Sequence, residues 1–153
     1  MPILHIQFNV TEAHSDDGQP VSVPPSVGLR HKGPCLQVTV GLLQPMAQAM
    51  LQQGQQVPSP ISGIALVDTG ASDTCIDGQA AQNLGLPVVD VVTMASASEA
   101  SASRNVYPVT IEVYGLPFPI GVPRAIGAEL HPQGLIALIG RASCNTAPSS
   151  TMA

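Results

Sequence analysis

The chain has 153 residues and a formal net charge of −5 at neutral pH, with 44% hydrophobic and only 10% charged residues. This length suits one domain, and the apolar fraction is sufficient for a core. Five Lys and Arg residues form no basic surface for nucleic acid, and no apolar run approaches the roughly 20 residues of a membrane-spanning helix. The 14 Gly and 15 Pro residues favour many turns and short strands.

Neither the N-terminus nor the cysteines indicate secretion. Residues 1–6 lack the basic region and continuous apolar stretch of a signal peptide. The three cysteines have no C-x-x-C spacing, and the four histidines have no metal-ligand spacing. We therefore expect a cytoplasmic protein without a disulfide framework, metal site or other cofactor.

The chain begins with a polar, turn-rich segment, residues 1–34, which is expected to form a partly loose N-terminal arm. The alternation of apolar and polar residues in 36–40 then predicts a half-buried strand. A short helix follows, with Pro45 at its start and Gly54 just past its end.

An apolar strand at 64–67 runs directly into an Asp-Thr-Gly turn at 68–70. A second short helix is expected after this turn, because Asp77 is a favourable N-cap and Gly85 a favourable C-terminal stop.

In the second half of the chain, the sequence patterns predict strands and no further helix. Segments 88–94 and 106–114 are separated by a small, serine-rich stretch, so we expect a long hairpin with a mobile tip. A short strand at 116–123 and an apolar strand at 135–139 complete the domain. The remaining residues, 142–153, show neither helical nor strand periodicity and are expected to form an irregular tail.

The turn at 68–70 places a carboxylate at the end of a strand, and this residue type indicates acid–base chemistry. Gly70 allows a close turn, and the Thr69 hydroxyl can bond a neighbouring backbone group. Proteolysis by carboxylates needs two acids that share one proton, one accepting a proton from water while the other donates. Because the chain offers one such turn, two chains would have to bring their Asp68 residues together.

The sequence Ala-Leu-Val-Asp-Thr-Gly-Ala-Ser at 65–72, with Leu-Ile-Gly-Arg at 138–141, resembles the retropepsin-like aspartic proteases. The resemblance covers about residues 36–141 and is nearest to bacterial cytosolic members. It implies a mostly β, acid-protease fold over residues 35–141: a closed barrel or sandwich with short helices and a flap hairpin.

The resemblance also implies a role for each matched residue. Asp68 would be the catalytic acid and base, Thr69 would brace the two-fold axis, and Gly70 would let substrate or water approach. The cleft would be lined by Ala71, Ser72 and Asp73, and by Ala97, Ser98 and Glu99 of a flap that spans 94–105. Gly140 and Arg141 would support the active loop from beneath.

Two features depart from the family pattern. The expected flap tip contains no glycine and carries Glu99. After Arg141 the chain lacks the acidic or amide residue, helix and final strand that build the dimer interface in relatives. When codons that encode this tail are chosen suitably, a different reading frame of the same nucleotides encodes an amino-acid sequence similar to the C-terminal sequence of relatives. The hypothesis is that the chain is a truncated or frameshifted member of the family. The gene sequence across codons 140–153 would test this hypothesis.

These patterns predict an aspartic endopeptidase that acts on peptide or protein substrates as a homodimer. The alternatives are a catalytically silent remnant, a peptide-binding module using the same cleft, or a structural β-domain. Asp68 could simply form a turn, and the serine-rich segment could be a plain loop. A serine hydrolase is disfavoured, because no Gly-x-Ser-x-Gly elbow is present. Cys75 is expected to be buried rather than reactive, and Arg141 to be a structural ion-pair partner.

Overall fold

The computed structural model describes residues 12–14, 18, 20–22, 33–94 and 101–144. Within the predicted arm, β1 (Glu12–His14) and β2 (Pro20–Ser22) form a small antiparallel pair. All other described elements belong to one mostly β body that follows this arm.

A ring of six strands closes into a barrel. In order around the ring, the strands are β3 (Cys35–Leu42), β4 (Ile61–Val67), β9 (Ala137–Ile139), β5 (Cys75–Asp77), β8 (Ile120–Ala128) and β7 (Ala102–Val113). The ring closes because β3 pairs with β4 along one edge and with β7 along the other. The closed, mostly β fold expected from the sequence is thus confirmed.

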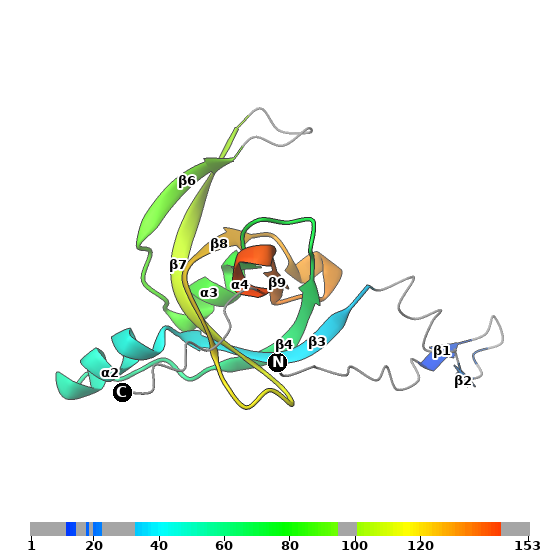
Figure 1. Cartoon of the computed structure of the whole chain (residues 1–153), viewed down its shortest axis with the longest axis horizontal. Coiled ribbons are helices and arrows are strands. Elements are labelled where there is room, and N and C mark those ends of the chain that lie inside the picture. Colours follow the sequence, from blue (N-terminus) through cyan, green and yellow to red (C-terminus); the bar gives the residue numbers. More distant parts are fainter. Residues whose placement is uncertain (1–11, 15–17, 19, 23–32, 95–100, 145–153) are drawn as a thin grey trace.

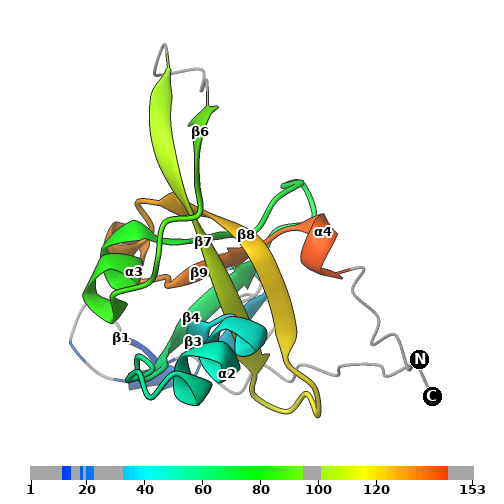
Figure 2. The ribbon, with the colours of Figure 1, turned by 90° about the vertical axis from the view of Figure 1, so that its left-hand side faces the viewer.

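The predicted hairpin is also present. Strand β6 (Asp90–Met94) pairs with β7 from Asp90 opposite Val106 to Met94 opposite Ala102. Figures 1 and 2 show this hairpin extending well beyond the barrel. Its predicted tip, with Ala97, Ser98 and Glu99, lies outside the described residues, so the mobility and contacts of these three residues stay predictions.

Short helices connect the strands. Helix α2 (Gln44–Gln52) has a proline in its first turn, and Gly54 follows it with a φ of 72°. Helix α3 (Gly78–Leu84) begins at Asp77, whose carboxylate accepts the Ala80 N–H, and ends at left-handed Gly85. Both predicted helices are confirmed, together with their start and stop residues. A 3₁₀ turn, η1 (His131–Gln133), leads toward β9.

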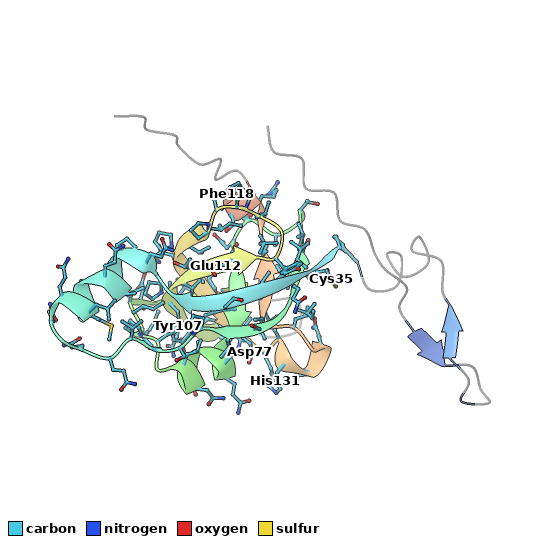
Figure 3. All side chains as sticks on the ribbon, turned by 90° about the horizontal axis from the view of Figure 1, so that it is seen from below. Cys35, Asp77, Tyr107, Glu112, Phe118 and His131 are labelled. Atoms are coloured by element: carbon cyan, nitrogen blue, oxygen red, sulfur yellow. The ribbon has the colours of Figure 1, made fainter. Side chains whose placement is uncertain are left out.

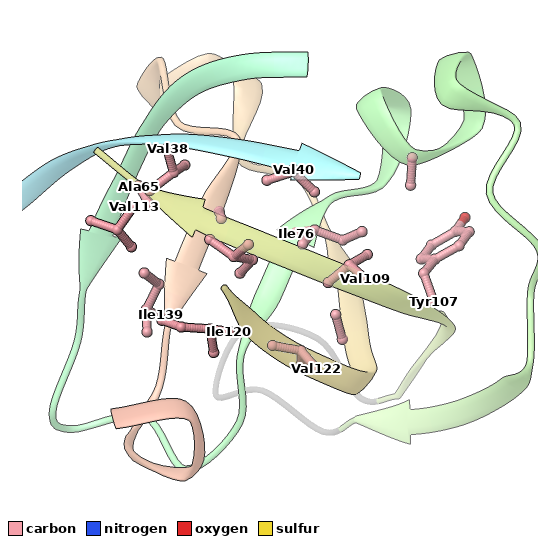
Figure 4. Close-up of a cluster of buried hydrophobic side chains, with 14 of the residues drawn as sticks. Val38, Val40, Ala65, Ile76, Tyr107, Val109, Val113, Ile120, Val122 and Ile139 are labelled. Atoms are coloured by element: carbon pink, nitrogen blue, oxygen red, sulfur yellow. The ribbon is translucent and has the colours of Figure 1, made fainter. Parts of the chain in front are cut away.

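The core consists of the inward-facing side chains of the barrel strands, as strand alternation requires. Val38, Ala65, Val109 and Ile139 are all almost completely buried, and Figure 4 shows these side chains converging inside the ring. Tyr107 is equally buried. A hypothetical Cβ on Gly127 would lie 3.0 Å from its ring, so the tyrosine occupies the space of a missing side chain.

Three sequence predictions were wrong in detail. The strand expected at 116–123 is β8, which begins only at Ile120, because the prolines at 117 and 119 cannot donate to a ladder. Strand β5 was not predicted, since three residues are too few to show a period. The tail was expected to be irregular from residue 142, yet α4 (Arg141–Cys144) forms a single helical turn.

Candidate active site

The loop that carries Asp68 begins where β4 ends, and both neighbouring segments hold its start. The Val67 N–H donates to the Pro34 carbonyl at 2.9 Å, and the Asp68 N–H donates to the Ile139 carbonyl at 3.0 Å. Hydrogen bonds between three distant parts of the sequence therefore fix the position of the Asp68 backbone at the end of β4.

The turn predicted at 68–70 is formed by the aspartate itself. The Gly70 N–H donates to Asp68 Oδ1 at 2.9 Å, and the Ala71 N–H donates to the Asp68 carbonyl at 3.2 Å. Asp68 is half-buried, whereas Thr69 and Gly70 are exposed. One carboxylate oxygen is thus oriented by the loop backbone while the loop tip faces solvent.

Gly140 lies directly against this loop, as the sequence predicted for a supporting residue. A Cβ on Gly140 would stand 2.2 Å from the Asp73 carbonyl oxygen, so only glycine fits. The Gly140 N–H donates to Thr74 Oγ1 at 3.1 Å, and Thr74 in turn shares a buried 2.6 Å hydrogen bond with the Ser143 hydroxyl. These contacts explain why α4 forms: its polar side chain and backbone are bonded to the active loop.

Arg141 supports the same loop mainly through its backbone. Its N–H donates to the Ala71 carbonyl at 2.9 Å, and the next N–H, of Ala142, donates to the Ser72 carbonyl at 3.1 Å. The exposed guanidinium reaches the Ser72 hydroxyl at 3.4 Å. Among residues 33–94 and 101–144 Arg141 forms no ion pair, so the expected carboxylate partner is not found there.

Sequence reasoning missed an apolar row beside Asp68. Cys35 is paired with Leu66, Leu66 with Leu138, and Leu138 with Cys75, so these four side chains line one face of four adjacent strands. All four are half-buried, whereas most of their inward-facing neighbours, such as Ala65 and Ile139, are buried in the core. Asp68 follows Leu66 by two residues and therefore starts on the same side of the sheet. The register that aligns these residues could not be read from periodicity alone.

Three of the predicted cleft residues, at positions 71–73, lie in the part of the chain that the structure describes. Ala71 is half-buried, and Ser72 and Asp73 are exposed. One groove of about 440 Å³ is lined by residues that include Glu112, Tyr114 and Phe118, and another of about 330 Å³ includes Arg104 and His131. Neither groove includes any of residues 68–73.

Two kinds of feature are absent from the described part of the chain. It holds no group of three or more His, Cys, Asp and Glu side chains placed to bind a metal ion. It also holds no helix long and apolar enough to cross a membrane.

The comparison with known families agrees with this geometry. Residues 60–122 match the family model of aspartyl proteases. Together with the closed barrel, this match supports an assignment to the retropepsin-like aspartyl proteases. The matched range includes the Asp68 loop, α3 and the hairpin, and it ends within β8, before Gly140. No curated protein matches the chain. The family match supports a general aspartic protease function.

One titratable group close to the candidate site, Cys75, has a shifted pKa. Burial, reinforced by the negative charge of Asp73, raises the pKa of the Cys75 thiol, although Arg104 acts in the opposite direction. The raised pKa disfavours the reactive thiolate at neutral pH, although the side chain is half-buried rather than buried as the sequence predicted. This agrees with the expectation of a thiol without a nucleophilic role.

Proposed function

We propose that the protein is an aspartic endopeptidase whose active site forms between two copies of the chain, each contributing Asp68. The observation that carries this proposal is the strand-end turn, in which the Gly70 N–H orients one oxygen of the half-buried Asp68 carboxylate. Two of the other described aspartates have partners of their own. Asp77 is buried in a hydrogen-bond network, and Asp90 pairs with Arg124.

Peptide hydrolysis by this pair follows from the chemistry of two adjacent carboxylates. Because two like charges in contact cannot both persist, one Asp68 is protonated and the other ionised. The ionised carboxylate takes a proton from a water molecule, whose oxygen attacks the peptide carbonyl carbon. The protonated carboxylate gives its proton to the carbonyl oxygen. Collapse of the resulting gem-diol breaks the C–N bond as the amine leaving group receives a proton.

We assign the other residues as the sequence suggests. Thr69 braces the two-fold axis, Gly70 leaves space for water or substrate, and residues 71–73 bind the substrate with residues 97–99 of the flap. Gly140 and Arg141 support the loop through the contacts described above. The family resemblance and the three cysteines without C-x-x-C spacing favour a bacterial, cytoplasmic protein.

The apolar row suggests the substrate class. Leu66 precedes the candidate acid by two residues and is paired with Leu138, so an extended peptide placed against Asp68 would bring its side chains onto this pair. We therefore propose cleavage between residues with apolar side chains.

The test is cleavage of a mixture of random-sequence peptides by the full chain, read by mass spectrometry. We expect Asp68→Asn to reduce cleavage by at least about a thousandfold, because it removes a transition-state proton transfer. Glu112→Gln makes the same chemical change at an exposed residue of β7 and should retain full activity. Cleavage that persists in Asp68→Asn would contradict the aspartic mechanism. Peptide binding without cleavage in the wild type would favour the binding module.

A further inference from the structure

Asp77 is more heavily hydrogen-bonded than a helix cap requires. Its side chain is 4% exposed. Oδ2 accepts the Ala80 N–H at 3.0 Å, which caps α3. Oδ1 serves a different segment: it accepts the N–H groups of Leu130 and His131 at 3.0 and 3.1 Å. The two oxygens therefore have separable functions.

The same residue also holds the far end of that segment. The Asp77 backbone N–H donates to the Ile136 carbonyl at 2.8 Å. The connection from Leu130 to Ile136 is thus fastened at its start by the Asp77 side chain and at its end by the Asp77 backbone. Figure 3 shows Asp77 and His131 side by side, where α3 meets the η1 turn. His131 Nδ1 lies 3.3 Å from Oδ1 and adds a third contact to this oxygen.

This connection leads directly into the apolar row. Ile136 donates its N–H to the Ile64 carbonyl, and two residues later Leu138 is paired with both Leu66 and Cys75. A displacement of the connection from Leu130 to Ile136 would therefore move Leu138 within the apolar row. Asp68 also bonds β9, through the Ile139 carbonyl, but it would be affected less, because Pro34 holds Val67 before it and the Gly140–Thr74 contact holds the end of β9.

We propose that Asp77 is a positioning residue. Through the hydrogen bonds that its side chain accepts from Leu130 and His131, it sets the position of Leu138, and so of this part of the apolar row, relative to Asp68. The activity part of this proposal rests on the proposed function. The structural part, that Oδ1 fastens the connection, stands on the hydrogen bonds alone.

The two functions of the carboxylate can be separated by substitution. Asp77→Ser keeps a side-chain oxygen that can cap α3 but is too short to reach Leu130 as well. We expect amide hydrogen exchange at Leu130 and His131 to become at least about tenfold faster, while the α3 amides exchange as in the wild type. The matched control is Asp90→Ser, which removes an exposed carboxylate and should change neither set of amides.

Activity provides the second measurement, made at enzyme concentrations that keep the wild type dimeric. We expect Asp77→Ser to raise KM for peptides with bulky apolar residues beside the cleaved bond by about threefold or more, with kcat within about twofold. Simple destabilisation would instead lower the amount of active enzyme, and hence apparent kcat, at unchanged KM. Asp77→Asn keeps one acceptor oxygen, so its KM should lie between the wild-type value and the raised value of Asp77→Ser.

The outcomes distinguish this proposal from the proposed function. Unchanged exchange at Leu130 and His131 in Asp77→Ser would overturn the proposal, and so would faster exchange with unchanged KM. If Asp77→Ser does not fold, Asp77→Asn takes its place in both measurements. If the wild type cleaves no peptide, the proposed function fails, and a positioning role in catalysis fails with it. Exchange then decides whether Asp77 fastens the connection.

Discussion

Gly140 illustrates how a single residue determines the shape of the candidate site. Replacing it with Ala would force a Cβ against the Asp73 carbonyl, so the active loop or β9 would have to move. We expect Gly140→Ala to lower the free energy of unfolding by about 3 kcal/mol, measured by urea denaturation. Gly78→Ala, whose added Cβ would meet only ordinary contacts at 3.7 Å, is the control. Equal stability of the two variants would contradict this account.

Asp77 predicts a pH dependence of stability. Burial by itself raises the pKa of this carboxyl, but the N–H groups of Leu130, Ala80 and His131 and the His131 ring outweigh burial and lower the pKa below its ordinary value. A folded-state pKa below the unfolded value, about 3.9, means that the ionised carboxylate stabilises the fold above that pH. This stabilisation disappears as the pH falls through the folded-state pKa.

The measurement is urea unfolding of the wild type and Asp77→Asn between pH 7 and pH 3. We expect the wild type to be more stable at neutral pH and the difference to shrink below about pH 4. Glu112→Gln, at an exposed carboxylate of β7, serves as the comparison. A difference that grows as the pH falls would show that the sign is wrong.

Cys75 gives a prediction for thiol chemistry. Because burial and Asp73 raise the pKa of its thiol, the reactive thiolate is scarce at neutral pH. We expect iodoacetamide to label Cys75 more slowly in the folded chain than in the urea-unfolded chain, with labelling rising only at higher pH. Mass spectrometry of the individual cysteine-containing peptides measures this. Equal rates in the folded and unfolded chains would contradict the assigned environment.

At the scale of elements, helix α3 depends on a left-handed residue at its end. Gly85 has a φ of 70°, a conformation that costs a side-chain-bearing residue about 1 kcal/mol. Gly85→Ala should therefore lower the free energy of unfolding by about that amount. Gln82→Ala, at an exposed position of the same helix, should leave stability unchanged or slightly increased. Thermal denaturation of both variants provides the comparison.

The elements also show where sequence reasoning succeeds and where it does not. Helix α3 was predictable because local chemistry, Asp77 before it and Gly85 after it, defines its ends. Strand β5 was not, because three residues between β8 and β9 owe their conformation to pairing partners distant in sequence. Helix α4 likewise depends on contacts with the active loop rather than on its own polar sequence.

For the whole molecule, the sequence predicted the closed barrel and the candidate acid but not the surroundings of that acid. The Asp-Thr-Gly turn and the Gly-Arg pair are local motifs, so Asp68 and Gly140 could be named in advance. The row from Cys35 to Cys75 arises only when four strands pair in register. The second function of Asp77 was also hidden, because its partners lie more than fifty residues away.

The central claim is that two chains each supply one Asp68, and a mixing experiment tests it directly. A fixed amount of wild-type chain is equilibrated with increasing Asp68→Asn chain, and the rate of peptide cleavage is measured. If two Asp68 residues form the site, exchange of subunits should reduce the rate to about half at equal concentrations and about one tenth at a ninefold excess. A rate that stays constant, in samples where light scattering shows mixed dimers, would contradict the shared active site.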